Sequence, residues 1–188
     1  MTDHTHESDS NTDVHEHNHA NEYNQSLQAA VLTVSSTRTF ETDESGEKIV
    51  ELFESNGHSV AVRELTSDDF DQVQNIVHRF VQRNDVDIVI TTGGTGVSPD
   101  DITVEAILPM FDKQLPGFGE LFRQLSRDEI GTRIISTRST AGIINGVPVF
   151  CLPGSTSAVD LGVSEIILQE ANHLVTLAQL EEEESTDT

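Results

Sequence analysis

The chain has very little cysteine and few basic residues, and each shortage excludes a class of protein. Cys151 is the one cysteine among 188 residues, so an internal disulfide is impossible and a reducing compartment fits. Ten Lys and Arg stand against 33 Asp and Glu, a formal charge of -23, which repels nucleic-acid phosphates and anionic membranes. No apolar run approaches the roughly 18 residues of a membrane span, and the acidic N-terminus does not resemble a signal peptide. We therefore expect a cytoplasmic protein that binds neither nucleic acid nor membrane, with Cys151 in its core.

The acidity is not confined to the ends of the chain. Residues 1–26 hold six acids and residues 181–188 hold five, which leaves 22 acids against all ten bases in 27–180, a net charge of -12. Lysine is nearly absent, with only Lys48 and Lys113. Hydrated carboxylates keep proteins soluble in strong salt, so we expect a salt-adapted source. The alternative is an ordinary acidic protein with acidic tails.

Length and patterning predict one globular domain between two tails. A chain of 188 residues with 35% hydrophobic residues suits a single core. Residues 1–26 have almost no apolar side chains to offset the entropy of ordering, so we expect a disordered tail. Its histidine-rich sequence could bind a transition metal, although a flexible tail fixes no geometry for one. Residues 181–188 indicate a second, acidic tail, which places the domain at 27–180.

Strands and helices alternate between the tails, which is typical of an α/β sheet covered on both faces. Residues 87–90 are too continuously apolar for a surface strand and suit the centre of a parallel sheet. Asn145-Gly146 lies between two apolar runs, the commonest signal for a tight hairpin. We expect an α/β fold, a three-layer α/β/α sandwich whose mostly parallel sheet contains one antiparallel hairpin. The expected strands are 29–34, 59–65, 86–91, 141–144 and 147–152, and the expected helices are 47–56, 70–81, one from about 102, an amphipathic stretch at 118–130 and a long closing helix after Ser155.

A glycine-rich segment follows the most apolar strand. Thr91 to Gly96 reads Thr-Thr-Gly-Gly-Thr-Gly and precedes a helix, where glycines let a ligand approach and N–H groups attract anions. No lysine follows as in a Walker A loop, and Pro99 stands where a dinucleotide fingerprint has its third glycine. The segment therefore indicates a phosphate-containing ligand, with a plain tight turn as the alternative.

Carboxylates adjoin this loop at Asp100 and Asp101. Because a carboxylate repels phosphate, we expect a divalent cation, Mg²⁺, between them. A helix N-cap is the alternative role for Asp101. A second glycine turn, Pro153 to Ser157, follows another apolar strand and offers hydroxyl and N–H groups to a second anion. Two such units suggest two phosphate-bearing substrates at the carboxyl ends of the strands.

Four motifs, in their order and spacing, resemble the MoaB/Mog family of molybdenum cofactor biosynthesis. The resemblance covers about residues 29–171, and the glycine loop followed by Asp101 is its most specific part. It implies a three-layer α/β domain, usually a homotrimer or homohexamer, which transfers AMP from ATP to the terminal phosphate of molybdopterin with Mg²⁺ and releases pyrophosphate. The motifs are Leu32-Thr33-Val34-Ser35, Thr92-Gly93-Gly94-Thr95-Gly96, Pro116-Gly117-Phe118-Gly119-Glu120 and Leu152-Pro153-Gly154-Ser155.

The resemblance also implies roles for single residues. Asp101 corresponds to the aspartate of the Mg²⁺ and nucleotide site, and Asp68 to a second functional aspartate, although Asp68 could instead cap the helix near Phe70. Arg138 could neutralise a phosphate or be a surface arginine. Relatives commonly carry lysine where this chain has Ser157, which removes a phosphate-binding charge. The nucleotide phosphates are expected at Thr92, Gly93, Gly94, Thr95 and Gly96, the pterin phosphate at Gly154, Ser155 and Ser157, and further ligand contacts at Ser35, Pro116, Gly117, Gly119, Glu120 and Pro153.

Two other functions stay open. Some members of the family bind pterin without transferase activity, which would make this chain a pterin-binding or assembly protein. Asp68 and Asp101 favour the enzyme, because a pure binder has no need for carboxylates beside phosphate. The metal-insertion relative has the same domain in a much longer chain, so the length of this chain argues against that function. We expect that relative as a downstream partner. The choice between molybdenum and tungsten does not follow from the sequence, because the transfer precedes metal insertion.

Overall fold

The computed structural model describes residues 25–183. The predicted tails therefore lie outside the described residues except at their inner ends. The last helix continues through Glu183, so its backbone extends three residues past the predicted end of the domain at 180. Within 25–183, no helix is both long and apolar enough to cross a membrane.

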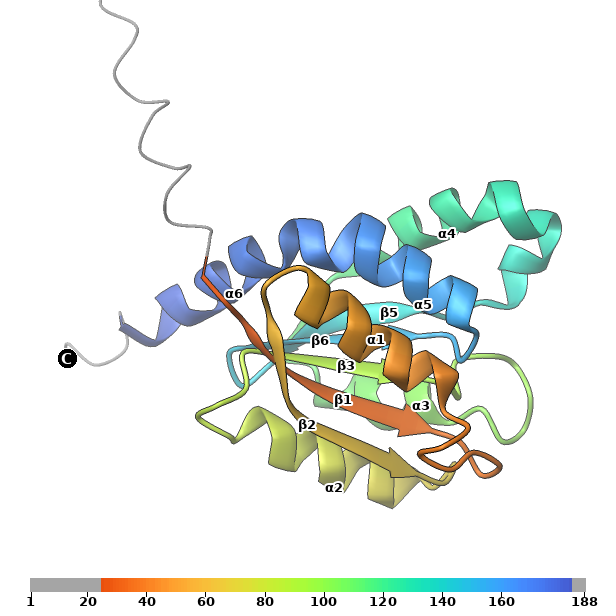
Figure 1. Cartoon of the computed structure of the whole chain (residues 1–188), viewed down its shortest axis with the longest axis horizontal. Helices are drawn as coiled ribbons and strands as arrows, with labels where there is room; N and C mark the ends of the chain where they lie inside the picture. The colour runs from red at the N-terminus through yellow and green to blue at the C-terminus, as the bar shows by residue number, and fades with distance from the viewer. Residues whose placement is uncertain (1–24, 184–188) are drawn as a thin grey trace, which may run out of the picture.

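Six strands form one sheet in the order β2-β1-β3-β6-β5-β4 (Figure 1). β1 pairs in parallel with β2 and β3, and β3 with β6, whereas β5 runs antiparallel to both β6 and β4. This confirms the predicted mostly parallel sheet with its hairpin. The two-residue strand β4 was not predicted, because it is too short to show a periodicity. The strands are β1 (Gln28–Val34), β2 (Ser59–Thr66), β3 (Ile88–Thr92), β4 (Lys113–Gln114), β5 (Thr140–Ile144) and β6 (Val147–Leu152).

Helices cover both faces of the sheet and complete the predicted three-layer sandwich (Figure 1). One face of the sheet is covered by α1, α4, α5 and α6, and the other face is covered by α2 and α3. The predicted long closing helix is interrupted by a π-helical turn, η3, that joins α5 to α6. The helices are α1 (Glu44–Ser55), α2 (Phe70–Val81), α3 (Thr103–Ile107), α4 (Pro116–Ile130), α5 (Thr156–Gly162) and α6 (Leu168–Glu183), with η1 (Leu108–Met110), η2 (Gly131–Ser136) and η3 (Val163–Ile167) between them.

The buried strands send alternate side chains into the two helical layers. Val31 and Ile90 pack in the layer of α1, whereas Leu32 and Val89, their neighbours in the chain, pack in the layer of α2. This period of two follows from strand geometry and gives the sheet two separate cores. Cys151 is fully buried in the second core, as predicted, and burial raises the pKa of its thiol to about 12. That thiol is a packing group and not a nucleophile.

The hairpin between β5 and β6 forms as the sequence predicts. Asn145 has a φ of 50° and Gly146 a φ of 74°. Positive φ at both central residues is the signature of the type I′ turn, whose twist matches that of the flanking strands.

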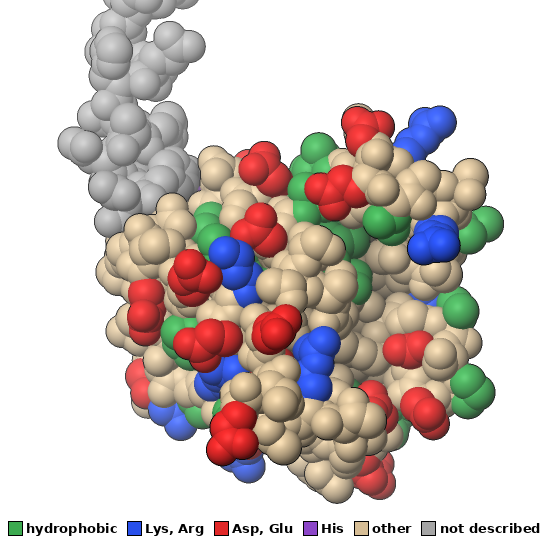
Figure 2. All heavy atoms as spheres, turned by 45° about the vertical axis from the view of Figure 1, so that its right-hand side comes forward, with side chains coloured by type: hydrophobic (Ala, Val, Ile, Leu, Met, Phe, Trp, Pro, Cys, Tyr) green, Lys and Arg blue, Asp and Glu red, His purple; other side chains and the backbone are tan. Residues whose placement is uncertain are grey.

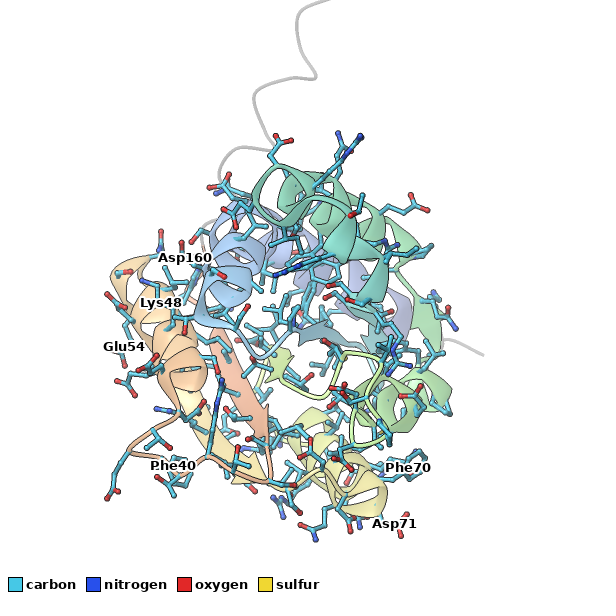
Figure 3. The ribbon with its side chains drawn as sticks, turned by 90° about the vertical axis from the view of Figure 1, so that its right-hand side faces the viewer. Phe40, Lys48, Glu54, Phe70, Asp71 and Asp160 are labelled. Atoms are coloured by element: carbon cyan, nitrogen blue, oxygen red, sulfur yellow. The ribbon has the colours of Figure 1, made fainter. Side chains whose placement is uncertain are left out.

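The order of the strands creates a crevice at their carboxyl ends. The chain leaves β1 toward α1 on one face of the sheet, and it leaves the adjacent β3 toward α3 on the other face. Neighbouring strands whose connections diverge in this way leave a gap between the two loops, where α/β proteins commonly bind ligands. Figure 3 looks onto this end of the sheet, with Phe40 in the loop after β1 and Phe70 at the start of α2.

A half-buried histidine fastens the start of the domain to the turn before β2. The Nδ1 atom of His58 accepts a hydrogen bond from the backbone N–H of Leu27 at 3.1 Å, and its ring lies 5.6 Å from that of Phe53. Accepting this bond requires a neutral imidazole. Burial lowers the pKa of His58 below its ordinary value of 6.5, in agreement with that requirement.

We expect this histidine to make stability depend on pH. Because the folded chain has the lower pKa, the unfolded chain binds more protons as the pH falls below about 6.5. The contribution of His58 is therefore complete above that pH and is lost as the pH falls toward the folded pKa. The free energy of unfolding in urea, measured from pH 7.5 to pH 5, should fall in the wild type and fall less steeply in His58→Gln. The exposed His78 on α2 supplies the control, and His78→Gln should follow the wild type. Parallel profiles for wild type and His58→Gln would contradict this account.

Candidate functional site

A cavity of about 530 Å³ opens at the carboxyl ends of β1, β3 and β6. We call it the strand-end cavity. Figure 2 shows the molecule from a side that includes this end, where acidic side chains are scattered among a few Lys and Arg. The predicted residues Ser35, Asp68, Gly93, Gly94, Thr95, Gly96, Asp101, Pro153 and Gly154 line it, together with Val34, Ser36, Thr37, Arg38, Asp100, Ser136 and Thr137.

The glycine loop lies so close to its neighbours that side chains cannot be added to it. Gly93 has a φ of +98°, and a Cβ atom there would lie 2.2 Å from the carbonyl oxygen of Val34. A Cβ atom on Gly96 would lie 2.7 Å from Oδ2 of Asp101. These glycines therefore bring the backbone against β1 and leave room for the Asp101 carboxylate.

Hydrogen bonds from Thr103, at the start of α3, hold the glycine loop in place. The hydroxyl of Thr103 donates to the carbonyl oxygen of Gly93 at 2.8 Å, and its backbone N–H donates to that of Gly94 at 2.9 Å. Oδ2 of Asp101 accepts the backbone N–H of Ser98 at 2.8 Å. The loop is thus an ordered surface with its peptide groups fixed, as a preorganised anion site requires.

Arg138 holds the same loop from outside the strand-end cavity. Its Nε–H donates to the carbonyl oxygen of Gly96 at 2.7 Å, and its Nη2 donates to that of Asp101 at 3.2 Å. The guanidinium also forms an ion pair with Glu105, and the hydrogen bond from Arg138 lowers the pKa of that carboxyl. Arg138 is therefore engaged by the loop and by Glu105, rather than lining the cavity.

The two aspartates are not helix caps. Asp69, and not Asp68, caps α2 by accepting the N–H of Gln72 at 2.9 Å. Asp68 instead accepts the backbone N–H and the hydroxyl of Ser36, at 2.8 and 2.7 Å, across the cavity from the glycine loop. No side chain caps α3, so the cap alternative for Asp101 is also wrong.

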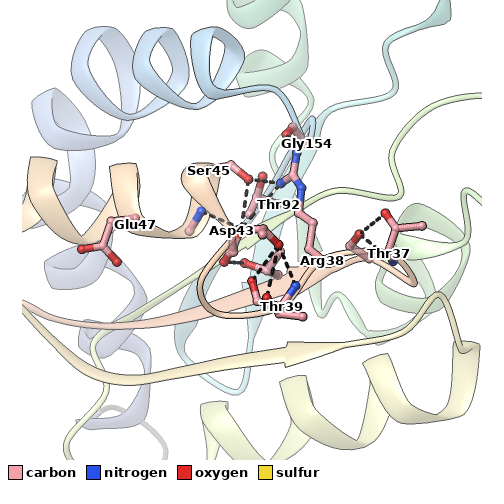
Figure 4. Close-up of polar contacts among 12 residues, drawn as sticks. Thr37, Arg38, Thr39, Asp43, Ser45, Glu47, Thr92 and Gly154 are labelled. Atoms are coloured by element: carbon pink, nitrogen blue, oxygen red, sulfur yellow. Dashed lines mark hydrogen bonds and ion pairs between the residues drawn. The ribbon is translucent and has the colours of Figure 1, made fainter.

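The two glycine turns are fastened to each other beneath the cavity. The N–H of Gly93 donates to the carbonyl oxygen of Leu152 at 3.0 Å, and the hydroxyl of Thr92 donates to that of Pro153 at 2.9 Å. Thr92 is buried, so it supports the cavity without lining it. From the other side, Nη2 of Arg38 donates to the carbonyl oxygen of Gly154 at 2.7 Å (Figure 4).

A buried carboxylate organises the loop after β1. Asp43 caps α1 by accepting the N–H of Gly46, and it also accepts from Thr33 at 2.6 Å and from Arg63 at 2.9 Å. Nη1 of Arg38 lies 3.5 Å from it (Figure 4). Burial opposes the ionisation of Asp43 and is the largest single influence, but these hydrogen bonds together outweigh it and lower its pKa. The charge of Asp43 is therefore maintained inside the fold.

The carboxylates of the cavity fit Mg²⁺ delivered with a phosphate. Among the residues that the structure describes, no group of three or more His, Cys, Asp or Glu side chains could hold a metal ion by itself. Asp68, Asp100 and Asp101 nevertheless line the same cavity. Mg²⁺ is usually bound by one or two carboxylates, with water and substrate phosphates completing its six ligands. This donor set suits Mg²⁺ and is too small for a metal site made by protein alone.

Four of the remaining predicted residues, Pro116, Gly119, Glu120 and Arg138, lie around a second cavity. We call this space, of about 550 Å³, the α4 cavity; Thr137 lines both this cavity and the strand-end cavity. Gly117 lies with Pro116 beside a third, apolar cavity of about 310 Å³. Ser155 caps α5, accepting the N–H of Ala158 at 3.3 Å, and neither Ser155 nor Ser157 lines the first two cavities. The α4 cavity is lined by Val104, Gln114, Pro116, Gly119, Glu120, Arg123, Ile135, Thr137, Arg138, Ser139 and Thr140.

Sequence reasoning missed Arg38, Ser36 and Asp43. The usable signal for the first two was position, because both follow directly after a buried strand, at the edge where ligands bind. Asp43 could have been found as an Asp three residues before Gly46 and four before Glu47, in a helix whose start was predicted three residues too late.

The chain resembles proteins of molybdenum cofactor biosynthesis. The profile of a family described as "probable molybdopterin binding domain" matches residues 30–173. Molybdenum cofactor biosynthesis protein B of Halalkalibacterium halodurans is 40% identical over 158 residues, which cover 84% of this chain and 93% of that protein. The protein of the same name in Bacillus subtilis is 43% identical over 150 residues, 79% of this chain and 88% of its own.

Solved structures agree in fold. A crystal structure of molybdenum cofactor biosynthesis protein B superposes with a TM-score of 0.80 at 39% identity, over 82% of this chain and 97% of the other. The tungsten cofactor synthesizing protein MoaB from Pyrococcus furiosus gives a TM-score of 0.74, also at 39% identity, over 82% of this chain and 98% of the other.

We expect the buried Asp43 to matter far more to stability than its exposed neighbour Glu47, although both pair with Arg63. Asp43→Ala removes a cap and leaves a half-buried arginine without its buried partner, which should cost about 3 to 5 kcal/mol of unfolding free energy. The Glu47 side chain is 71% exposed, so Glu47→Ala should cost about 1 kcal/mol or less. Urea denaturation near pH 7 measures both losses. Equal losses for the two variants would refute the central role given to Asp43.

Proposed function

The chain belongs to the molybdopterin-binding domain family of cofactor biosynthesis, and from that membership we propose that it is a molybdopterin adenylyltransferase. In this proposal the enzyme transfers AMP from ATP to the terminal phosphate of molybdopterin. The observation that carries it is the strand-end cavity, where a rigid glycine loop faces Asp68 and has Asp101 at its end. Peptide dipoles suit phosphates, and carboxylates in the same space suit the cation that a polyphosphate brings.

The proposed reaction needs positioning more than covalent help from the protein. A phosphate oxygen of molybdopterin attacks the α-phosphorus of ATP, a new phosphoanhydride bond forms, and the α–β bond breaks. The electron pair of that bond leaves with pyrophosphate. The glycine loop holds the nucleotide phosphates, and the turn at Pro153 and Gly154 forms the adjoining wall, so the two phosphates meet in one orientation.

Mg²⁺ fits this scheme at Asp101, with Asp68 and Asp100 in reach of the same space. When bound, Mg²⁺ supplies positive charge that offsets the charge of the phosphates. The chain keeps the Asp101 side chain at the cavity through two hydrogen bonds. The backbone N–H of Ser98 donates to the Asp101 carboxylate, and Arg138 donates to the Asp101 carbonyl oxygen.

The second substrate has a place beside the first. We assign the α4 cavity, which shares the lining residue Thr137 with the strand-end cavity, to the pterin portion of molybdopterin. This gives a ligand-binding role to Gly119 and Glu120, which line only that cavity of the two. We further assign the protein to the cytoplasm, as a homotrimer or homohexamer that passes its product to a metal-insertion protein.

A pterin-binding or assembly protein without transferase activity is the second candidate. Ser157 favours it, because the lysine expected there would have added positive charge for a phosphate. The same experiments decide between the two candidates.

The transferase makes a direct prediction. Purified protein mixed with molybdopterin, ATP and Mg²⁺ in high salt should form adenylylated molybdopterin and pyrophosphate, detected by chromatography and a coupled phosphate assay. Asp101→Asn should reduce turnover by about 100-fold or more, because the amide cannot ligate Mg²⁺ as the carboxylate does. Its oxygen can still accept the N–H of Ser98, so the loop should stay folded.

The matched control changes a carboxylate outside the site. Asp128→Asn removes the same charge from an exposed position on α4, away from the strand-end cavity, and should retain most of the activity. Wild type that binds molybdopterin tightly but yields no product would replace the enzyme with the binding protein. Normal turnover in Asp101→Asn would end the role given to that residue.

We also propose that the protein works in a salt-rich cytoplasm, as its formal charge of -23 suggests. Salt screens the repulsion among carboxylates, so the melting temperature should rise by about 5 °C or more between 0.2 and 2 M KCl. Potassium chloride is the right salt because it is not a strongly excluded one such as sulfate, which stabilises most proteins. An unchanged or falling melting temperature would leave the acidity unexplained by salt adaptation.

A further inference from the structure

The strand-end cavity has an uneven charge. Three carboxylates line it, those of Asp68, Asp100 and Asp101, and the polyphosphate proposed to enter it is an anion. Arg138 is engaged on the far side of the glycine loop, and Ser157 supplies no charge. Among the described residues, Arg38 is the one Lys or Arg that lines this cavity.

The position of Arg38 is fixed by its surroundings. Nη1 donates to the hydroxyl of Ser45 and lies 3.5 Å from the carboxylate of Asp43, and Nη2 donates to the carbonyl oxygen of Gly154 (Figure 4). A guanidinium has five N–H groups, so these contacts leave Nε–H and one N–H of Nη2 without an acceptor among the described residues. The side chain is 31% exposed. A fixed cation thus presents donors at the wall of the cavity.

Arg38 is not the main ion-pair partner of Asp43. That carboxylate already accepts hydrogen bonds from Thr33, Gly46 and Arg63, all at 3.0 Å or less. The contact between Asp43 and Arg38 is longer, at 3.5 Å, and the carboxylate has its hydrogen-bond donors without it. A purely structural arginine would be the main partner of the buried charge, and here Arg63 fills that place.

We propose that Arg38 is the phosphate-binding cation of the strand-end cavity, acting beside the turn at Gly154, which adjoins the glycine loop. This assignment rests on the proposed adenylyltransferase function, and it names the residue that compensates for the lysine absent at Ser157. A planar, permanently charged fork suits a phosphate oxygen pair. It also explains how so acidic a chain retains an anion site with few cations.

The test measures binding and not only catalysis. The full-length chain, in wild-type, Arg38→Gln and Arg38→Lys forms, is titrated calorimetrically in high KCl with magnesium pyrophosphate and with MgATP. Arg38→Gln can still donate to Gly154 but has no charge, and its affinity should fall by about tenfold or more. Arg38→Lys should recover much of the loss. Arg83→Gln is the control, because Arg83 precedes β3 at the opposite end of the sheet and pairs with Asp85.

Melting temperatures show whether a loss of affinity comes from unfolding of a variant. Because Asp43 retains four other donors, Thr33, Ser45, Gly46 and Arg63, both Arg38 variants should melt close to the wild type, and titrations are run where all variants are folded. Equal affinity in wild type and Arg38→Gln, or no recovery in Arg38→Lys, overturns the assignment of Arg38. Wild type that binds neither probe overturns the proposed function itself.

Discussion

The geometry of the strand-end cavity depends on the ionised carboxylate buried at Asp43. A charge removed from water is tolerated only when donors surround it, and those donors come from β1 at Thr33, from β2 at Arg63 and from the first turn of α1 at Gly46. Satisfying one carboxylate therefore joins three elements. The loop from Ser35 to Asp43 is held against the sheet as a result, and Arg38 is aimed at the turn after β6.

The second constraint is the contact between backbones. The glycine loop after β3 lies against the end of β1 and is hydrogen-bonded to the end of β6, so three strand ends form one continuous surface. Thr103 and Arg138 then fix the loop by donating hydrogen bonds to its carbonyl oxygens, at Gly93 and Gly96. Because these bonds use carbonyl oxygens, the shape of the surface is set mainly by the main chain, and the side chains of Asp68, Asp101 and Arg38 are added to it.

The sequence predicted the fold more completely than the site, for a physical reason. The strand predicted at 86–91 and the Asn145-Gly146 turn are specified by local patterns, and both are present, the strand at 88–92. The glycine loop and Asp101 were also found, because glycines before a helix are a local signal. Long-range hydrogen bonds have no such signal: the engagement of Arg138 with Gly96, 42 residues away, and of Arg38 with Gly154, 116 residues away, depends on packing. The choice of Asp69 over Asp68 as a cap likewise depends on Ser36, a residue from another strand end.

The glycines in the lining of the strand-end cavity, where the ligand meets main chain, have a consequence for how such a protein can evolve. Peptide dipoles contribute local attraction for an anion and add no net charge, whereas the formal charge of -23 is carried by side chains. Net charge and local affinity for an anion are then set by different groups of atoms, so exposed charges can change in evolution while the main chain that lines the cavity stays the same.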